Sequence, residues 1–158
     1  DMDIIRARKR PVKDIDYGYV GDVSEVNTSE LRLLLNEGIT PIIAPLTHDG
    51  KGSMLNTNAD TIASELAVAL SSSFSVDLVY CFEKNGVLAN PDDDNSVIPY
   101  LDKNTYAEYK QTGAIAAGMI PKLDNAFAAL NNGVARVLII NANNLTRPAS
   151  TGTTIVRE

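Results

Sequence analysis

Apolar residues gather in short blocks along the chain, and the spacing inside successive blocks alternates between two types. Continuous runs rich in β-branched residues are typical of buried strands, whereas apolar residues three or four positions apart are typical of helices. The predicted strands are 3–10, 17–23, 39–46, 76–82, 137–140 and 153–156. The predicted helices lie between Asn27 and Gly38 and at 59–70, 104–111 and 118–132.

Turn and cap residues support this division of the chain. Pro11 to Asp16 separates the first two strands and predicts a hairpin. Asn27 followed by Glu30 has the form of a capping box, and Gly38 supplies a helix stop. Because 39–46 is almost entirely apolar, we expect it to be a central strand covered on both faces.

Alternating strands and helices predict one α/β domain, a three-layer αβα sandwich around a mainly parallel central sheet. In such folds, ligands bind beyond the carboxyl ends of parallel strands. The loops after Leu46, Phe82 and Ile140 are therefore the places where we expect a site.

Composition narrows the class of protein. A formal net charge of -6 argues against a nucleic-acid partner. No apolar stretch approaches the roughly 20 residues that span a bilayer, and no signal peptide is recognisable, so we expect neither a membrane partner nor secretion. The single cysteine, Cys81, excludes an internal disulfide, which fits a reducing cytoplasm. The start at Asp1, directly before a predicted strand, suggests that an N-terminal portion is missing.

Several familiar chemistries lack their parts. The chain has no G-x-x-x-x-G-K-[ST] phosphate loop and no G-x-G-x-x-G fingerprint. Its only histidine, His48, stands in a glycine-rich loop, where an exposed residue without a chemical role is favoured over a triad member. One Cys and one His do not make a usual zinc site, and Asp92 to Asp94 reads as a solvated turn, so we predict no metal bound by protein ligands alone.

Asn56, Asn58 and Asp60 lie at the start of a predicted helix, where backbone N–H groups point toward an anion. Capping is the simpler interpretation for the two asparagines. Because the asparagines already suffice to cap the helix, capping does not explain Asp60. Lys122 follows Pro121 in the first turn of another helix, where a cation opposes the helix dipole. A surface lysine and a lysine that holds phosphate both remain open for this position.

Four segments carry a resemblance to a known family. They are Leu55-Asn56-Thr57-Asn58-Ala59-Asp60, the run from Leu78 to Leu88, Gly118-Met119-Ile120-Pro121-Lys122, and Gly152-Thr153-Thr154-Ile155-Val156. In this order they resemble the acetylglutamate kinases of the amino acid kinase superfamily. The resemblance implies ATP-dependent phosphorylation of the γ-carboxylate of N-acetylglutamate or N-succinylglutamate, in arginine biosynthesis. It also implies Mg²⁺ held mainly by the nucleotide, and a homo-oligomer in the complete protein.

The resemblance also implies roles for individual residues. Asn56 and Asn58 would bind the substrate, with Asn56 on its α-carboxylate. Asp60 would orient catalytic lysines, and Lys122 would stabilise the phosphoryl group in transfer. The residues implied in ATP binding are Glu83, Lys84, Asn85, Gly86, Val87, Leu88, Ala114, Ile115 and Ala116.

The chain departs from the family pattern at three places. Phe82-Glu83 replaces a Ser-Asp or Thr-Asp pair, and Ala117 stands where Gly or Asp is common. The N-terminal glycine-rich segments have no counterpart. We therefore expect residues 1–27 to be a hairpin region of the N-terminal lobe and residues 28–158 to be the ATP-binding lobe. We expect this chain to be inactive without the missing portion. A noncatalytic nucleotide-binding or regulatory module and another amino acid kinase are the alternatives.

Overall fold

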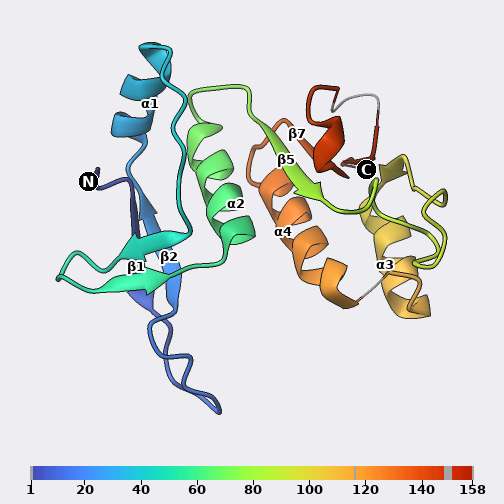
Figure 1. Ribbon diagram of the computed structural model, residues 1–158, viewed down its shortest axis with the longest axis horizontal. Helices are drawn as coiled ribbons and strands as arrows, with labels where there is room; N and C mark the ends of the chain where they lie inside the picture. Colours follow the sequence, from blue (N-terminus) through green and yellow to red (C-terminus); the bar gives the residue numbers. More distant parts are fainter. Residues whose placement is uncertain (1, 116, 148–150, 158) are drawn as a thin grey trace. The chain divides into compact units, whose positions relative to one another are not determined.

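The computed structural model describes residues 2–115, 117–147 and 151–157. The chain divides into two compact units, residues 1–70 and residues 71–158, which we call the N-terminal unit and the C-terminal unit. Figure 1 shows the elements of each unit along the chain.

The N-terminal unit is built on a four-stranded sheet with the order β2-β1-β3-β4. Its strands are β1 (Ile5–Lys9), β2 (Gly21–Val26), β3 (Leu46–His48) and β4 (Met54–Asn56). β1 is antiparallel to β2 and parallel to β3, and β3 is antiparallel to β4. The helices are α1 (Thr28–Asn36) and α2 (Ala59–Leu70), and α2 packs on β2. The predicted hairpin is confirmed, and Figure 1 shows its loop reaching away from the sheet.

Helix α1 begins and ends at the predicted residues, but its start differs in detail. Asn27 is the N-cap, yet its side chain makes no capping hydrogen bond. Its Oδ1 instead accepts a hydrogen bond from the Ser29 hydroxyl at 2.6 Å. The predicted capping box is therefore not formed. Gly38 has φ of +73°, a conformation that favours glycine and ends the helix.

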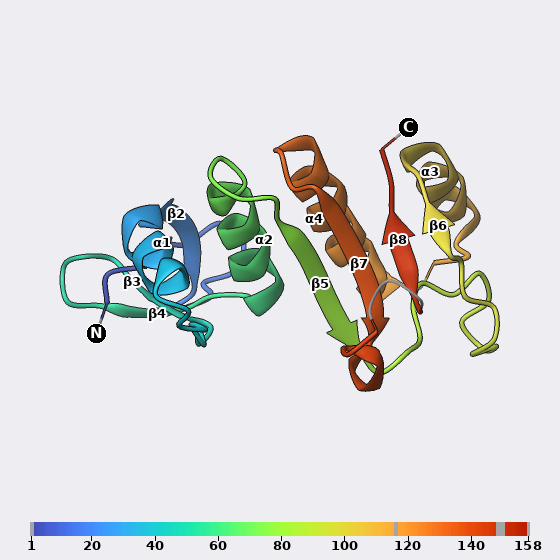
Figure 2. The same ribbon diagram turned by 90° about the horizontal axis from the view of Figure 1, so that it is seen from above.

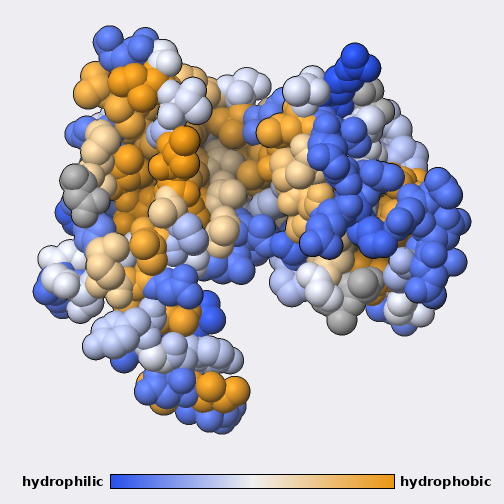
Figure 3. All heavy atoms as spheres, in the orientation of Figure 1, coloured by the Kyte–Doolittle hydropathy of each residue, from blue (hydrophilic) through white to orange (hydrophobic). Residues whose placement is uncertain are grey.

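The prediction of a central strand over residues 39–46 is wrong for this structure, because only Leu46 belongs to a strand. Ile42 is 97% exposed and Ile39 is 50% exposed. A β-branched run becomes a buried strand only when neighbouring strands and covering helices are present. The segment instead borders an apolar groove of about 510 Å³ together with residues from β1, α1, β3 and β4. Figure 3 shows an apolar area on this unit.

The C-terminal unit carries the second sheet, with the order β5-β7-β8-β6, which can be followed in Figure 2. Its strands are β5 (Asp77–Phe82), β6 (Tyr100–Leu101), β7 (Arg136–Asn141) and β8 (Thr153–Ile155). β5 is parallel to β7 and β6 is parallel to β8, whereas β7 and β8 are antiparallel. The helical elements are α3 (Lys103–Thr112), η1 (Ala117–Met119), α4 (Ile120–Asn131) and η2 (Ala142–Asn144).

The core of the C-terminal unit is formed largely by β7 and α4. Four consecutive residues of β7, from Val137 to Ile140, are buried, and because successive side chains point to opposite faces, both faces of this strand are covered. Leu123, Ala126 and Leu130 of α4 are also buried. The α/β class is thus confirmed, with mixed sheets in both units. β4 and β6 were not predicted, since strands of three and two residues leave no periodic signal.

No helix in the described ranges is long and apolar enough to cross a membrane. The expected division of the complete protein after residue 27 stays a prediction.

Candidate functional site

The polar segment at the start of α2 stands on a buried hydroxyl network. Thr57 is 3% exposed and Thr47 is 1% exposed, and their hydroxyl oxygens lie 2.8 Å apart. The Thr57 hydroxyl also donates to the Gly21 carbonyl oxygen at 3.2 Å. A Cβ at Gly21 would lie 2.8 Å from the Leu55 Cβ, so only glycine fits beneath this segment. The network fixes the chain on either side of Thr57.

Asn56 and Asn58 flank this buried residue and are exposed, but they make different contacts. The backbone N–H of Asn56 donates to the Tyr19 carbonyl oxygen at 2.8 Å. The Asn58 Oδ1 accepts the Thr61 N–H at 3.0 Å, so Asn58 caps α2. Asp60, half-buried, is in the first turn of α2, where a carboxylate favours the helix dipole. Capping explains Asn58, and its predicted substrate contact stays a prediction.

Removing the cap of α2 should lower stability without touching the core. We expect Asn58→Ala to reduce the free energy of unfolding by about 1 kcal/mol, the usual cost of losing an N-cap side chain. Thermal unfolding of the N-terminal unit, followed by circular dichroism, measures this. Asn56→Ala is the matched control, because the Asn56 side chain makes no hydrogen bond with the described part of the chain. An equal loss in both variants would contradict the capping assignment.

In the C-terminal unit, two predicted nucleotide segments meet around one small cavity. The cavity measures about 100 Å³ and its exposed lining is mostly apolar. One wall is the loop after β5 and the other precedes α4. The lining residues are Lys84, Gly86, Val87, Leu88, Pro91, Ile115 and Met119. Five of these seven were predicted to bind ATP: Lys84, Gly86, Val87, Leu88 and Ile115.

Leu88, one of the residues that line this cavity, forms part of a short antiparallel β-bridge. It pairs with Val97 in an antiparallel bridge, flanked by hydrogen bonds from Ala89 to Ser96 and from Ile98 to Val87. In such a pair, the N–H and C=O of Leu88 point away from Val97. They make no hydrogen bond with the described residues, although Leu88 is only 8% exposed. A ligand on the side of Leu88 away from Val97 would therefore meet one donor and one acceptor.

Lys122 lies at the carboxyl end of β5. Its Nζ is 4.3 Å from the centroid of the Phe82 ring, a cation–π contact. Phe82 pairs with Asn141 at the end of the parallel strand β7, and the Asn141 Nδ2 donates to the Glu83 carbonyl oxygen at 2.6 Å. Phe82, which departs from the family pattern, thus supports the lysine. The ammonium lies where α/β folds bind ligands.

The first turn of α4 is anchored to α3 by a tyrosine. The Tyr106 hydroxyl donates to the Asp124 Oδ1 at 2.7 Å, with the Ile120 carbonyl oxygen at 3.3 Å. The Tyr106 ring stacks on Phe127 at a centroid distance of 5.2 Å. Burial, aided by the hydrogen bond to Asp124, raises the pKa of Tyr106. The anchor fixes the helix end that carries Lys122.

Lys84 is engaged in an ion pair. Its Nζ lies 2.6 Å from the Asp94 Oδ1, and this hydrogen bond is the main cause that raises the pKa of Lys84. Both side chains are more than half exposed, so solvent screens the pair. The acidic loop is an exposed turn, as predicted, and this ion pair links it to the loop after β5.

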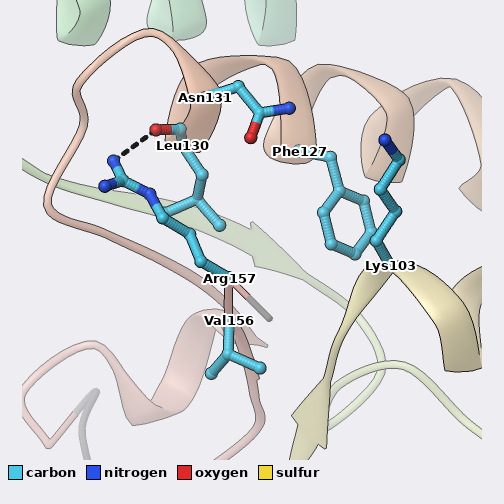
Figure 4. Close-up of a pocket in the computed structure, with 6 residues that line it drawn as sticks. All are labelled: Lys103, Phe127, Leu130, Asn131, Val156 and Arg157. Carbon is cyan, nitrogen blue, oxygen red and sulfur yellow. Dashed lines mark hydrogen bonds between the residues drawn. The ribbon is translucent and has the colours of Figure 1, made fainter.

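A larger cavity of about 320 Å³ lies elsewhere in the C-terminal unit and is shown in Figure 4. The Arg157 guanidinium donates to the Leu130 carbonyl oxygen and, at 3.2 Å, to the Val134 carbonyl oxygen. A cation bound to these carbonyls stabilises the C-terminus of α4. Lys103, Phe127, Asn131 and Val156 complete the lining. Because its arginine already has these structural partners, we place the candidate site at the smaller cavity.

The predicted residues thus fall into two groups. Asn56, Asn58 and Asp60 belong to the N-terminal unit, whereas Lys122 and the nucleotide segments belong to the C-terminal unit. Glu83 and Asn85 belong to the same loop and are exposed, Ala114 is half-buried beside the cavity residue Ile115, and Ala116 lies outside the described residues.

The predicted binding residues do not include Gly152 and Thr153, which contact the loop after β5. The Thr153 hydroxyl accepts the Val87 N–H at 2.8 Å, and a Cβ at Gly152 would lie 3.1 Å from the Asn85 carbonyl oxygen. The signal was present, since both residues belong to a segment that carried the resemblance. Within the described ranges, no three His, Cys, Asp or Glu side chains gather as a metal site.

Comparisons with known proteins place the chain in a family. The acetylglutamate kinase of Phocaeicola vulgatus is 56% identical over 151 residues, which are 96% of this chain and 59% of that protein. That of Cytophaga hutchinsonii is 58% identical over 92% of this chain and 55% of its own length. The crystal structure of N-acetylglutamate synthase from Neisseria gonorrhoeae, complexed with coenzyme A and L-arginine, has a TM-score of 0.86 and 27% identity. It covers 99% of this chain and 37% of that one.

The chain spans little more than half the length of these two kinases. Residues 1–141 match the amino acid kinase family, which is well over half of the chain. This chain belongs to the amino acid kinase family.

Proposed function

We propose that this chain is the nucleotide-binding portion of an enzyme that phosphorylates the γ-carboxylate of N-acetylglutamate or N-succinylglutamate with ATP, a step of arginine biosynthesis. The observation that carries the proposal is the cavity that joins the loop after β5 to the segment before α4. Its residues are the ones that the resemblance implies for ATP. The identity to acetylglutamate kinases supports the acceptor.

The lining of the cavity fits a nucleobase. Val87, Leu88 and Ile115 are buried and supply apolar faces for a flat ring. The N–H and C=O of Leu88 supply one donor and one acceptor for its polar edge. Apolar walls with a few placed polar groups are the usual composition of a small-molecule site. Lys84 also lines the cavity, and its ammonium group would attract the phosphates of a nucleotide.

The chemistry requires alignment and charge compensation more than proton transfer. A carboxylate is already a nucleophile, so its attack on the γ-phosphorus of ATP forms an acyl phosphate without a general base. Lys122, at the carboxyl end of β5, would compensate the negative charge that is shared between the acceptor and the leaving ADP. Asn56 would hold the α-carboxylate of the substrate, and Asp60 would orient the lysines.

Mg²⁺ would enter with the nucleotide and neutralise its phosphate oxygens. Magnesium keeps several waters and is bound through substrate phosphates with few protein ligands.

We expect the complete protein to have two lobes. Residues 1–27 would belong to the lobe that binds the acylglutamate, and 28–158 to the ATP-binding lobe. The apolar groove beside Ile42 would be covered by further strands of that protein, since an apolar patch of this kind is rarely left exposed. A homo-oligomer working in the cytoplasm completes the proposal.

The test is a complete enzyme, made by joining this chain to the N-terminal half of the kinase from Phocaeicola vulgatus. We expect ATP-dependent formation of an acyl phosphate, detected as the hydroxamate after reaction with hydroxylamine. Parallel assays with carbamate, aspartate and N-succinylglutamate define the acceptor. A folded chimera that binds ATP but forms no acyl phosphate with any acceptor would favour a noncatalytic module and sink the proposal.

A further inference from the structure

Thr153 interrupts the main-chain pairing of residues 87–98, the loop that follows β5. In an antiparallel pair, two residues that face each other in the hydrogen-bonded position exchange both of their N–H to C=O bonds. Val87 and Ile98 occupy this position next to the Leu88–Val97 bridge. Only one direct bond is made, from the Ile98 N–H to the Val87 carbonyl oxygen at 2.8 Å.

The Thr153 hydroxyl takes the place of the second bond. Its oxygen accepts the Val87 N–H at 2.8 Å and donates to the Ile98 carbonyl oxygen at 2.7 Å. Thr153 is 0% exposed, so water does not compete for either group. One buried hydroxyl thus satisfies a donor and an acceptor and holds the two segments apart at one end of the hairpin.

Gly86 is matched to this hydroxyl. A Cβ at Gly86 would lie 2.8 Å from the Thr153 Oγ1 and 2.9 Å from the Val97 Cγ1. The loop therefore approaches Thr153 as closely as a glycine allows. Gly86, Val87 and Leu88 all line the candidate nucleotide cavity, whereas Thr153 does not.

We propose that Thr153 is a positioning residue for nucleotide binding: its hydroxyl sets the opening of the 87–98 pair, and so places the Leu88 main-chain groups at the cavity. The inference rests on the proposed function. Without the hydroxyl, Val87 and Ile98 either bond directly, which moves Leu88, or stay unsatisfied, which loosens the loop. Both outcomes change the cavity without removing any residue that lines it.

The test uses the chain 1–158 and titration calorimetry with ATP and Mg²⁺. Thr153→Val keeps the side-chain shape and removes the hydroxyl, and we expect about tenfold weaker binding, equivalent to roughly 1.4 kcal/mol. Thr153→Ser keeps the hydroxyl and should bind within about twofold of the unaltered chain. Thr154→Val is the matched control, since neighbouring strand residues face opposite sides. It should leave affinity unchanged.

The outcomes separate the two proposals. Unaltered affinity in a folded Thr153→Val variant, or equal losses in Thr153→Val and Thr153→Ser, would overturn the positioning role alone. Failure of the unaltered chain to bind ATP would overturn nucleotide binding by this chain, and the role of Thr153 with it. Should Thr153→Val not fold, amide hydrogen exchange of the unaltered chain decides. We expect ATP to slow exchange at Val87 and Leu88, and no change there would contradict the inference.

Discussion

Lys122→Ala in the complete enzyme should reduce turnover by about 10² to 10³, the usual cost of removing one group that stabilises charge in the transition state. The ammonium lies over the Phe82 ring at the carboxyl end of β5. In the proposed reaction the protein has little covalent chemistry to perform, so loss of the charge that we assign to the phosphoryl group removes a main contribution. Initial rates of acyl-phosphate formation at saturating ATP measure the effect.

The Lys122→Ala protein should stay folded. Lys122 is not among the buried residues of α4, and a lysine in the first turn of a helix opposes the helix dipole. Lys103→Ala is the matched control, because Lys103 occupies the first turn of α3 in the same unit and lies outside the candidate nucleotide cavity. Turnover of Lys122→Ala within a few-fold of the Lys103→Ala value would refute the assignment.

How far the sequence predicts the site depends on the range of the contacts involved. The two segments predicted to bind ATP could be named because each is a continuous run, and the structure brings residues of both to one cavity, while ATP binding itself stays a prediction. The role of Thr153 could not be predicted, since its hydroxyl bonds residues 66 and 55 positions earlier in the chain. The contact between Lys122 and Phe82 is also long-range. Motifs reveal such residues only as a resemblance, without their geometry.

The fold shows the same division. α2 was predicted to the residue because its apolar spacing and its asparagine cap are local. The segment 39–46 was misjudged because composition reports a preference for burial and not the partner that provides it. Ile42 is 97% exposed despite its strong preference for strands. A prediction of burial from a short apolar run thus assumes neighbours that only the assembled sheet supplies.

Replacement by alanine should affect the stability of the protein at Gly152 but not at Gly118. Gly152 has φ of +92°, and a Cβ there would lie 2.3 Å from the Ile139 carbonyl oxygen. Gly152→Ala therefore combines backbone strain of roughly 1–3 kcal/mol with an overpacking cost of about the same size. We expect a large fall in the unfolding temperature of the C-terminal unit, or no folded protein.

Gly118→Ala should leave the folded chain as stable as before. A Cβ at Gly118 meets nothing within 4 Å, and its φ lies outside the left-handed region. Alanine also favours the helical turn by up to about 1 kcal/mol.

A glycine at this position would also let the backbone approach a phosphate closely. In that case the Gly118→Ala variant binds ATP more weakly, while its unfolding temperature is maintained or raised. Calorimetric unfolding and ATP titration of both variants measure the contrast. Equal destabilisation by the two substitutions would show that Gly118 is a structural glycine, and unchanged ATP affinity would show that its backbone does not approach the phosphates.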